Sequence, residues 1–175
     1  MTSYFIIPDL GDSGMDHWQT YFENSGANFK RIIQKEWDAT LCTDWVTTVE
    51  KSISMYDHAK VVLLGHSLDC ATVAHWARQY QKKIRGTLLV APSDIKNPVY
   101  TFPAMEFNPI PKEKINFKTI VVARSNDPWG PLKRAKYFAD RLGSEFLDIG
   151  EAGHINAAFD HGEWKEGLAI LKKLN

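Results

Sequence analysis

The chain has little cysteine and no excess of charge of either sign. Its 175 residues include only two cysteines, and 21 lysines and arginines are balanced by 21 aspartates and glutamates. Cys42 and Cys70 form no metal-ligand spacing and no disulfide framework, so we expect reduced thiols in a cytoplasmic protein. A net charge of zero creates no overall field that attracts nucleic acid or an anionic membrane. We therefore expect neither as a partner.

Long hydrophobic runs, internal repeats and linkers are also missing. The first apolar run, in SYFIIPDLG, is far too short to span a bilayer and has no basic region before it. We therefore expect neither a signal peptide nor membrane insertion. Without a linker, residues 1–175 are expected to form a single domain. The loop PDLGDSG lacks the glycine patterns of dinucleotide and P-loop sites, which argues against a flavodoxin-like or nucleotide-binding domain.

Short apolar runs rich in β-branched residues alternate with amphipathic stretches along the whole chain. This alternation is typical of an α/β fold, in which helices cover a parallel sheet. The expected six strands span residues 3–8, 29–34, 60–65, 86–91, 118–124 and 145–149. The expected helices span residues 16–24, 43–56, 68–81, 131–142 and 162–174.

One long segment, residues 92–117, is rich in proline and has no clear helical period. Long irregular segments in small domains are often functional. We expect this one to pass over the carboxyl ends of the strands and to wall part of a pocket, and a plain surface excursion is the alternative. Ligands of such sheets bind beyond the carboxyl ends of the strands, so polar residues directly after each strand are the candidates for a site.

Ser67 is the first such candidate, in the stretch KVVLLGHSLDC. It follows an expected strand and precedes an expected helix, which is the context of a nucleophile elbow. Gly65 permits a tight turn, and the amides that open the next helix can stabilise an oxyanion. The alternative is a serine that only caps the helix.

His154 and Asp127 supply the other two roles that a serine nucleophile needs. Serine requires a base, and His154 in EAGHINAAF follows the last expected strand. Asp127 in ARSNDPWG follows the fifth, so the order nucleophile, acid, base is that of α/β-hydrolases. Alternatives for the acid are Asp94 and Asp148, although Asp148 lies deep in its strand, and Asp127 could simply form a turn before Pro128.

The expected oxyanion hole combines the amide of Leu68 with an amide of the loop after the first strand. Leu10 is the preferred donor by position, and Gly11 is the other candidate and is expected to border the substrate. His66 lies next to Ser67, where the sharp turn is expected to point its side chain away.

With these residues assembled, the chain resembles the small serine hydrolase family of α/β-hydrolases that includes retinoblastoma-binding protein 9 and its bacterial relatives. The matching pieces are GMDHWQ, EWD followed by DWV, GHSL, SNDPW and GHINAAF, which together extend over residues 14–159. The resemblance implies a minimal α/β-hydrolase fold without a lid domain, with Ser67 as nucleophile, Asp127 as acid and His154 as base. It also implies that His17 and Trp18 support the oxyanion loop.

Two positions depart from the family pattern. The family's namesake is associated with a Leu-x-Cys-x-Glu motif that binds retinoblastoma protein, but LDCAT ends here in Thr72, so we do not expect that partner. Asp69 stands where the family has glycine or a small residue. As a charge near the site it is expected to lower turnover without abolishing nucleophilicity, and the alternative is an aspartate that only favours the start of a helix.

The sequence thus predicts a serine hydrolase that cleaves small carboxylic esters through an acyl-enzyme, with no metal or organic cofactor implied. Thioesters and peptide-like amides are alternative substrates. Four aromatic residues are expected either to form an apolar wall of the pocket or to belong to the core: Tyr100, Phe102, Phe107 and Trp129. The competing hypothesis is a binding module that has kept the fold and lost efficient chemistry. The oligomeric state stays open.

Overall fold

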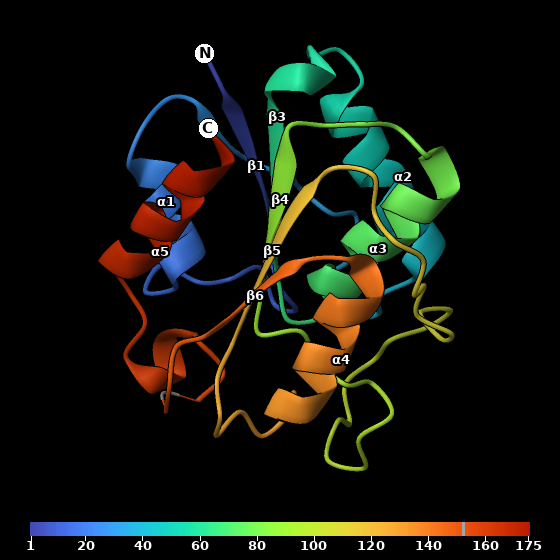
Figure 1. Ribbon diagram of the computed structural model, residues 1–175, viewed down its shortest axis with the longest axis vertical. Coiled ribbons are helices and arrows are strands. Elements are labelled where there is room, and N and C mark those ends of the chain that lie inside the picture. The colour runs from blue at the N-terminus through green and yellow to red at the C-terminus, as the bar shows by residue number, and fades with distance from the viewer. Residues whose placement is uncertain (152) are drawn as a thin grey trace.

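The computed structural model describes residues 1–151 and 153–175 and contains one six-stranded sheet between two layers of helices (Figure 1). The sheet order is β2-β1-β3-β4-β5-β6, and every neighbouring pair is parallel. The strands are β1 (Ser3–Ile7), β2 (Phe29–Arg31), β3 (Val61–His66), β4 (Gly86–Val90), β5 (Lys118–Ala123) and β6 (Glu145–Asp148). The expected six-stranded parallel sheet is confirmed.

Five α-helices of the described residues cover the two faces of the sheet. On one face lie α1 (Trp18–Asn24) and α5 (Lys165–Leu171), and on the other lie α2 (Cys42–Ile53), α3 (Asp69–Tyr80) and α4 (Leu132–Leu142) (Figure 1). Three short 3-10 helices are η1 (His58–Lys60), η2 (Ala157–Phe159) and η3 (Lys172–Leu174). No helix of the described chain is both long enough and apolar enough to cross a bilayer.

The strands are apolar on both sides because each face packs against helices. In β3, Val61 and Leu63 belong to the cluster under α2 and α3, whereas Val62 and Leu64 belong to the cluster under α1 and α5. This alternation follows from the two-residue period of a strand. Each fully buried side chain of this kind contributes about 1.5–3 kcal/mol to folding.

Three expected elements differ from the structure by three residues at an end. One of them is the second helix, which was expected over residues 43–56 but ends at Ile53. The second strand was expected over residues 29–34 but stops at Arg31, because β1 pairs with it only from Tyr4 to Ile6. The last helix was expected over residues 162–174 but begins at Lys165, because Trp164 adopts a non-helical conformation and its ring packs against Trp18.

Residues 92–117 run from the end of β4 to the start of β5 without a helix or strand. Met105 forms a parallel bridge with Leu41, and Phe107 is fully buried beside Trp45. Phe107 is therefore a core residue. The first part of the segment, described below, borders the site.

The strand order reverses direction between β1 and β3, because β2 lies on one side of β1 and β3 on the other. Open α/β sheets bind ligands at such a switch point, beyond the carboxyl ends of the strands. The segment after β1 and the turn after β3 meet at this point.

Candidate active site

Ser67 lies in a strained turn between β3 and α3. Its φ is +55°, a left-handed value that costs a residue with a side chain about 1–3 kcal/mol, and such strain is concentrated at functional sites. A Cβ on Gly65 would lie 3.0 Å from the carbonyl oxygen of Asp69, so the turn is too tight there for a side chain. This geometry is that of a nucleophile elbow.

The hydroxyl of Ser67 is hydrogen-bonded to Ser93, which follows β4. The two Oγ atoms are 2.8 Å apart, and both residues are buried. The described structure gives Ser67 no hydrogen bond to His154. The bond to Ser93 therefore competes with any hydrogen bond from Ser67 to a base.

His154 and Asp127 form a buried pair at the ends of β6 and β5. The distance from Nδ1 of His154 to Oδ2 of Asp127 is 2.8 Å. Oδ1 of Asp127 accepts hydrogen bonds from the amides of Trp129, at 2.9 Å, and Gly130, at 3.1 Å. The carboxylate is therefore fixed on one side and holds the imidazole on the other, which leaves Nε2 as the nitrogen for proton transfer.

The other two aspartates considered as the acid lie outside this arrangement. Asp94 is bonded to Nε of Arg134 at 2.9 Å, and Asp148 accepts from the amide of Gly150 at 3.0 Å. Both serve local structure.

The amide of Leu10, the preferred oxyanion donor, already has an acceptor. It donates to Oδ1 of Asp9 at 2.8 Å. The amide of Leu68 stands directly before α3, at the N-cap position. The role of Leu68 in an oxyanion hole stays a prediction, and Leu10 can contribute only when Asp9 gives up its amide.

A groove of about 270 Å³ lies between the loop after β1 and residues 156–158. Asp9, Leu10 and Gly11 line one side of it, and Asn156 lines the other. Gly11 has φ +74° and is exposed beside the groove, and its contact with a substrate stays a prediction.

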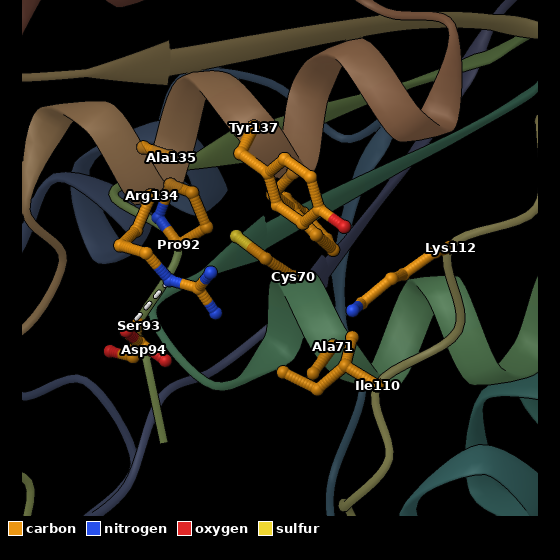
Figure 2. Close-up of a pocket in the computed structure, with 11 residues that line it drawn as sticks. Cys70, Ala71, Pro92, Ser93, Asp94, Ile110, Lys112, Arg134, Ala135 and Tyr137 are labelled. Atoms are coloured by element: carbon orange, nitrogen blue, oxygen red, sulfur yellow. Dashed lines mark hydrogen bonds and ion pairs between the residues drawn. The ribbon is translucent and has the colours of Figure 1, made fainter. Parts of the chain in front are cut away.

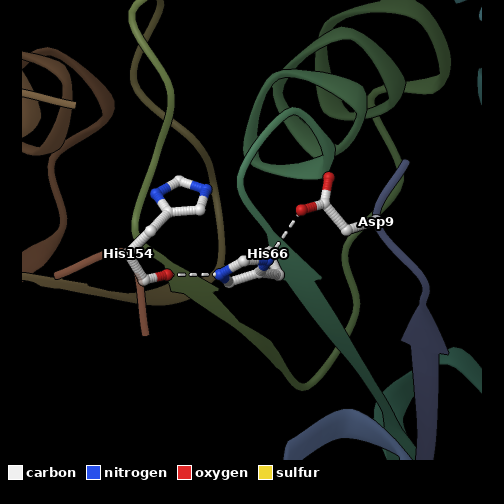
Figure 3. A group of neighbouring side chains, drawn as sticks. All are labelled: Asp9, His66 and His154. Carbon is white, nitrogen blue, oxygen red and sulfur yellow. Dashed lines mark hydrogen bonds and ion pairs between the residues drawn. The ribbon is translucent and has the colours of Figure 1, made fainter. Parts of the chain in front are cut away.

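The second oxygen of Asp9 contacts His66 (Figure 3). Oδ2 lies 3.0 Å from Nδ1 of His66, and Nε2 of His66 lies 2.8 Å from the carbonyl oxygen of His154. The side chain of His66 is fully buried, and its ring packs against that of His154 with centroids 4.8 Å apart. The sequence did not predict this contact: His66 lies under the loop that carries His154.

These three residues also offer the atom types that bind a divalent cation. The ligating atoms of Asp9, His66 and His154 all lie within 4.8 Å of one another. However, the hydrogen bond between Asp9 and His66 already uses two of them. A cation could bind only by displacing the proton between these two atoms.

Burial and charge give the ionisable groups here different protonation states. Burial alone would raise the pKa of Asp9, but the hydrogen bond to His66, the charges of His66 and His154 and the Leu10 amide lower it below its ordinary value. Burial, followed by the charge of His66, lowers the pKa of His17 to about 2. His17 is thus neutral, and its Nδ1 caps α1 by accepting from the amide of Gln19.

Asp69 is fully buried at the start of α3. Burial raises its pKa well above the ordinary value, and the charge of Asp9 raises it further, against a weaker effect of the hydrogen bond from Thr72. Burial thus favours the protonated form of this side chain. The direction of this shift disfavours a full negative charge at Asp69, and the effect of Asp69 on turnover stays a prediction.

Aromatic side chains extend from His154 towards the segment after β4. The ring of Trp129 lies 4.7 Å from that of His154, Phe102 lies 5.7 Å from Trp129, and Tyr100 lies 5.4 Å from Phe102. Burial raises the pKa of Tyr100, and the carboxyl groups of Asp9 and Asp69 raise it further. Three of the four aromatic residues thus adjoin the site.

A second, narrow pocket of about 50 Å³ lies between α3 and α4 (Figure 2). Ser93, the partner of Ser67, lines it together with apolar groups of both helices. The positive side chains at its rim are Lys112 and Arg134, and Arg134 is paired with Asp94.

Sequence reasoning missed the roles of three polar residues. Asp9 and Ser93 directly follow strands and so carried a positional signal, but nothing in the sequence showed which atoms they would contact. His66 is the residue between the glycine and serine of the elbow, and its partners come from two distant loops.

Comparison with known proteins agrees with this geometry. A family model described as serine hydrolase matches residues 4–173. A solved structure described as a YdeN-like hydrolase, from Pectobacterium atrosepticum, is 32% identical and has a TM-score of 0.88, over 99% of this chain and 90% of that chain. The ydeN gene product of B. subtilis is 16% identical, with a TM-score of 0.78 over 99% of this chain and 98% of that one.

More distant structures share the fold. A monoacylglycerol lipase from Paleococcus ferrophilus is 16% identical and has a TM-score of 0.72, over 99% of this chain and 95% of that chain. Among curated proteins, none has a sequence that matches. The family model and the 32% identical structure confirm the predicted resemblance. The chain belongs to the serine hydrolase family.

Proposed function

We propose that the protein cleaves small carboxylic esters through an acyl-enzyme on Ser67, with His154 as general base and Asp127 as the acid that orients it. The observation that carries this proposal is the buried His154–Asp127 pair, which lies at the same edge of the sheet as the strained turn of Ser67. A base held in one tautomer at the same sheet edge as such a turn is the arrangement that activates a serine.

The reaction begins when Ser67 leaves its bond to Ser93 and turns towards Nε2 of His154. The hydroxyl attacks the ester carbonyl carbon while His154 takes its proton, and the carbonyl oxygen becomes an oxyanion near the amide of Leu68. The protonated His154 then gives its proton to the departing alcohol, which leaves an acyl group on Ser67. A water molecule that loses a proton to His154 hydrolyses the acyl-enzyme.

A small, neutral and mainly apolar substrate fits the surroundings best. Phe102 and Trp129 provide apolar surface beside His154, and the pocket next to Ser93 is narrow and mostly apolar, which favours a short acyl group. The carboxylate of Asp9 disfavours an anion near the carbonyl. Two structures of the same fold are described as a monoacylglycerol lipase and as a thermophilic esterase from Thermogutta terrifontis, and both names agree with ester cleavage.

Covalent labelling tests the proposal. A fluorophosphonate probe is expected to label the parent on one residue, and labelling is expected to vanish in Ser67→Ala and to persist in Ser125→Ala, which removes an exposed serine after β5. Parent protein that has not been treated with the probe should hydrolyse p-nitrophenyl acetate and butyrate faster than longer esters. A folded parent that takes up no probe would contradict the proposal.

A second candidate function is a binding module without efficient chemistry. The observations that favour it are the hydroxyl of Ser67 bonded to Ser93 and the amide of Leu10 bonded to Asp9. The same labelling experiment separates the two functions, since a binding module has no need of a nucleophilic serine.

A further inference from the structure

The side chain of His66 connects the loop after β1 with the loop after β6. Nδ1 faces the carboxylate of Asp9, and Nε2 faces the carbonyl oxygen of His154 (Figure 3). Both partners are acceptors, and a neutral imidazole has only one N–H to donate. With Asp9 ionised, both hydrogen bonds form only if His66 carries two protons.

His66 is held in this orientation from several sides. Its ring is fully buried, 4.9 Å from the ring of His17 and 6.1 Å from that of Trp18 by their centroids. The charged or titratable groups that face it are Asp9, His17 and His154. Of these, His17 is neutral, which leaves Asp9 as the one carboxylate that can pair with His66.

The backbone that His66 contacts has little regular structure of its own. Gly153 and Ile155, on either side of His154, both have left-handed conformations, with φ +62° and +51°. The amide of Gly153 donates to Oδ1 of Asn126 at 2.7 Å, and the ring of His154 is bonded to Asp127. The hydrogen bond from His66 is therefore a third point of attachment, and it acts on the main chain of His154 itself.

We propose that Asp9 and His66 are positioning residues for His154, joined as an ion pair that fixes the backbone of the base relative to the oxyanion loop. This inference rests on the proposed function of Ser67 and His154. One oxygen of Asp9 holds the amide of Leu10 and the other holds His66, so the pair connects the loop of the oxyanion hole to the loop of the base. The connection passes through the residue directly before the nucleophile.

Three variants test the connection from Asp9 through His66 to the backbone of His154. Asp9→Ala removes the partner of His66, and His66→Asn keeps a donor for Asp9 but is too short to reach the carbonyl of His154. Asp9→Asn is the conservative variant: its oxygen can accept from Leu10, and its amide can donate to a neutral His66 that still donates to His154. Glu50→Gln, which weakens the ion pair between Glu50 on α2 and Lys82, is the control for the loss of an ion pair away from the site.

The rates of fluorophosphonate labelling and of p-nitrophenyl acetate hydrolysis are measured, with folding checked by circular dichroism. Because a misplacement of about 1 Å costs on the order of 100-fold in rate, Asp9→Ala and His66→Asn are expected to lower kcat about 10- to 100-fold with little change in KM. Asp9→Asn is expected to recover most of the loss. In ¹⁵N-histidine NMR spectra, His66 should be doubly protonated in the parent and singly protonated, on Nε2, in Asp9→Asn.

Three results would overturn the inference. They are parental rates in Asp9→Ala and His66→Asn, an Asp9→Asn variant as slow as Asp9→Ala, and a His66 that is singly protonated in the parent. A faster Asp9→Ala variant would also overturn it and would show that Asp9 merely blocks the oxyanion hole. The proposed function fails separately, because it fails when the parent itself takes up no probe.

Discussion

Nδ1 of His154 lies 2.8 Å from Oδ2 of Asp127, and only 3% and 1% of the two side chains are exposed. The other oxygen of Asp127 is bonded to two amides of its own loop. Because the two amides bind one oxygen of this buried carboxylate, the other oxygen is left to bind the imidazole. The pair is therefore set for one tautomer of His154.

Replacing Asp127 with asparagine is expected to lower kcat about 10²- to 10⁴-fold, because the amide group would present a donor to Nδ1 and favour the wrong tautomer. Hydrolysis of p-nitrophenyl acetate measures this loss. Asp94→Asn, which alters an exposed ion pair with Arg134, should stay close to the parent. If Asp94→Asn caused the larger loss, the acid would have been assigned to the wrong strand end.

Removing the hydroxyl of Ser93 is expected to speed the labelling of Ser67 by a fluorophosphonate. A hydrogen bond of this kind contributes about 0.5–1.5 kcal/mol, so Ser93→Ala should increase the second-order rate constant about 2- to 10-fold. Ser125→Ala controls for the loss of an exposed serine. A fall of about 100-fold would instead mean that the hydroxyl of Ser93 takes part in the reaction.

The parts of the site that could be predicted are those that depend on position along the sheet. Ser67, Asp127 and His154 each follow a strand, and parallel strands bring their carboxyl ends to one edge. The strands are apolar on both faces, and this pattern explains why the six strands could be predicted. The end of β2 could not be predicted, because it depends on pairing with β1. The start of α5 could not be predicted either, because it depends on the packing of Trp164.

Contacts between side chains of different loops could not be predicted. Asp9 and His66 are 57 residues apart, and their hydrogen bond depends on the conformation of both loops. The burial of Asp69 could not be predicted for a related reason: the sequence shows a carboxylate at a helix start, and only the fold shows that it is fully buried.

Asp69→Asn is expected to stabilise the protein increasingly as the pH rises. The folded state raises the pKa of Asp69, so its contribution to stability is complete below the ordinary pKa and is lost as the pH rises towards the folded-state value. Over that range the unfolding free energy of the parent should fall relative to the variant by at most about 1.4 kcal/mol per pH unit. Urea unfolding at pH 5, 6 and 7 measures the difference.

The same variant tests the charge of Asp69 through turnover. Because burial favours the neutral form of Asp69, asparagine is expected to keep kcat for p-nitrophenyl acetate within a few-fold of the parent. A stability difference that does not change with pH, together with a large rise in kcat, would show that Asp69 is ionised and restrains the reaction.

Gly153→Ala is expected to cost more stability than the same change at Gly150. Both glycines have positive φ, +62° and +82°, which alone makes alanine unfavourable by about 1 kcal/mol. A Cβ at Gly153 would also lie 2.0 Å from Cδ1 of Phe159, whereas none of the described atoms outside its immediate neighbours lies within 4 Å of a Cβ at Gly150. Overpacking of this kind adds about 1–3 kcal/mol, and urea unfolding measures the total.

Because Gly153 precedes His154, Gly153→Ala should also slow the labelling of Ser67, and Gly150→Ala should not. Phe159 is 38% exposed, so truncating it costs little and removes the clash. The double variant Gly153→Ala/Phe159→Ala is therefore expected to regain both the steric part of the stability and most of the labelling rate. If the double variant stayed as slow as Gly153→Ala, the backbone conformation at Gly153, rather than the space beside Phe159, would be what holds His154 in place.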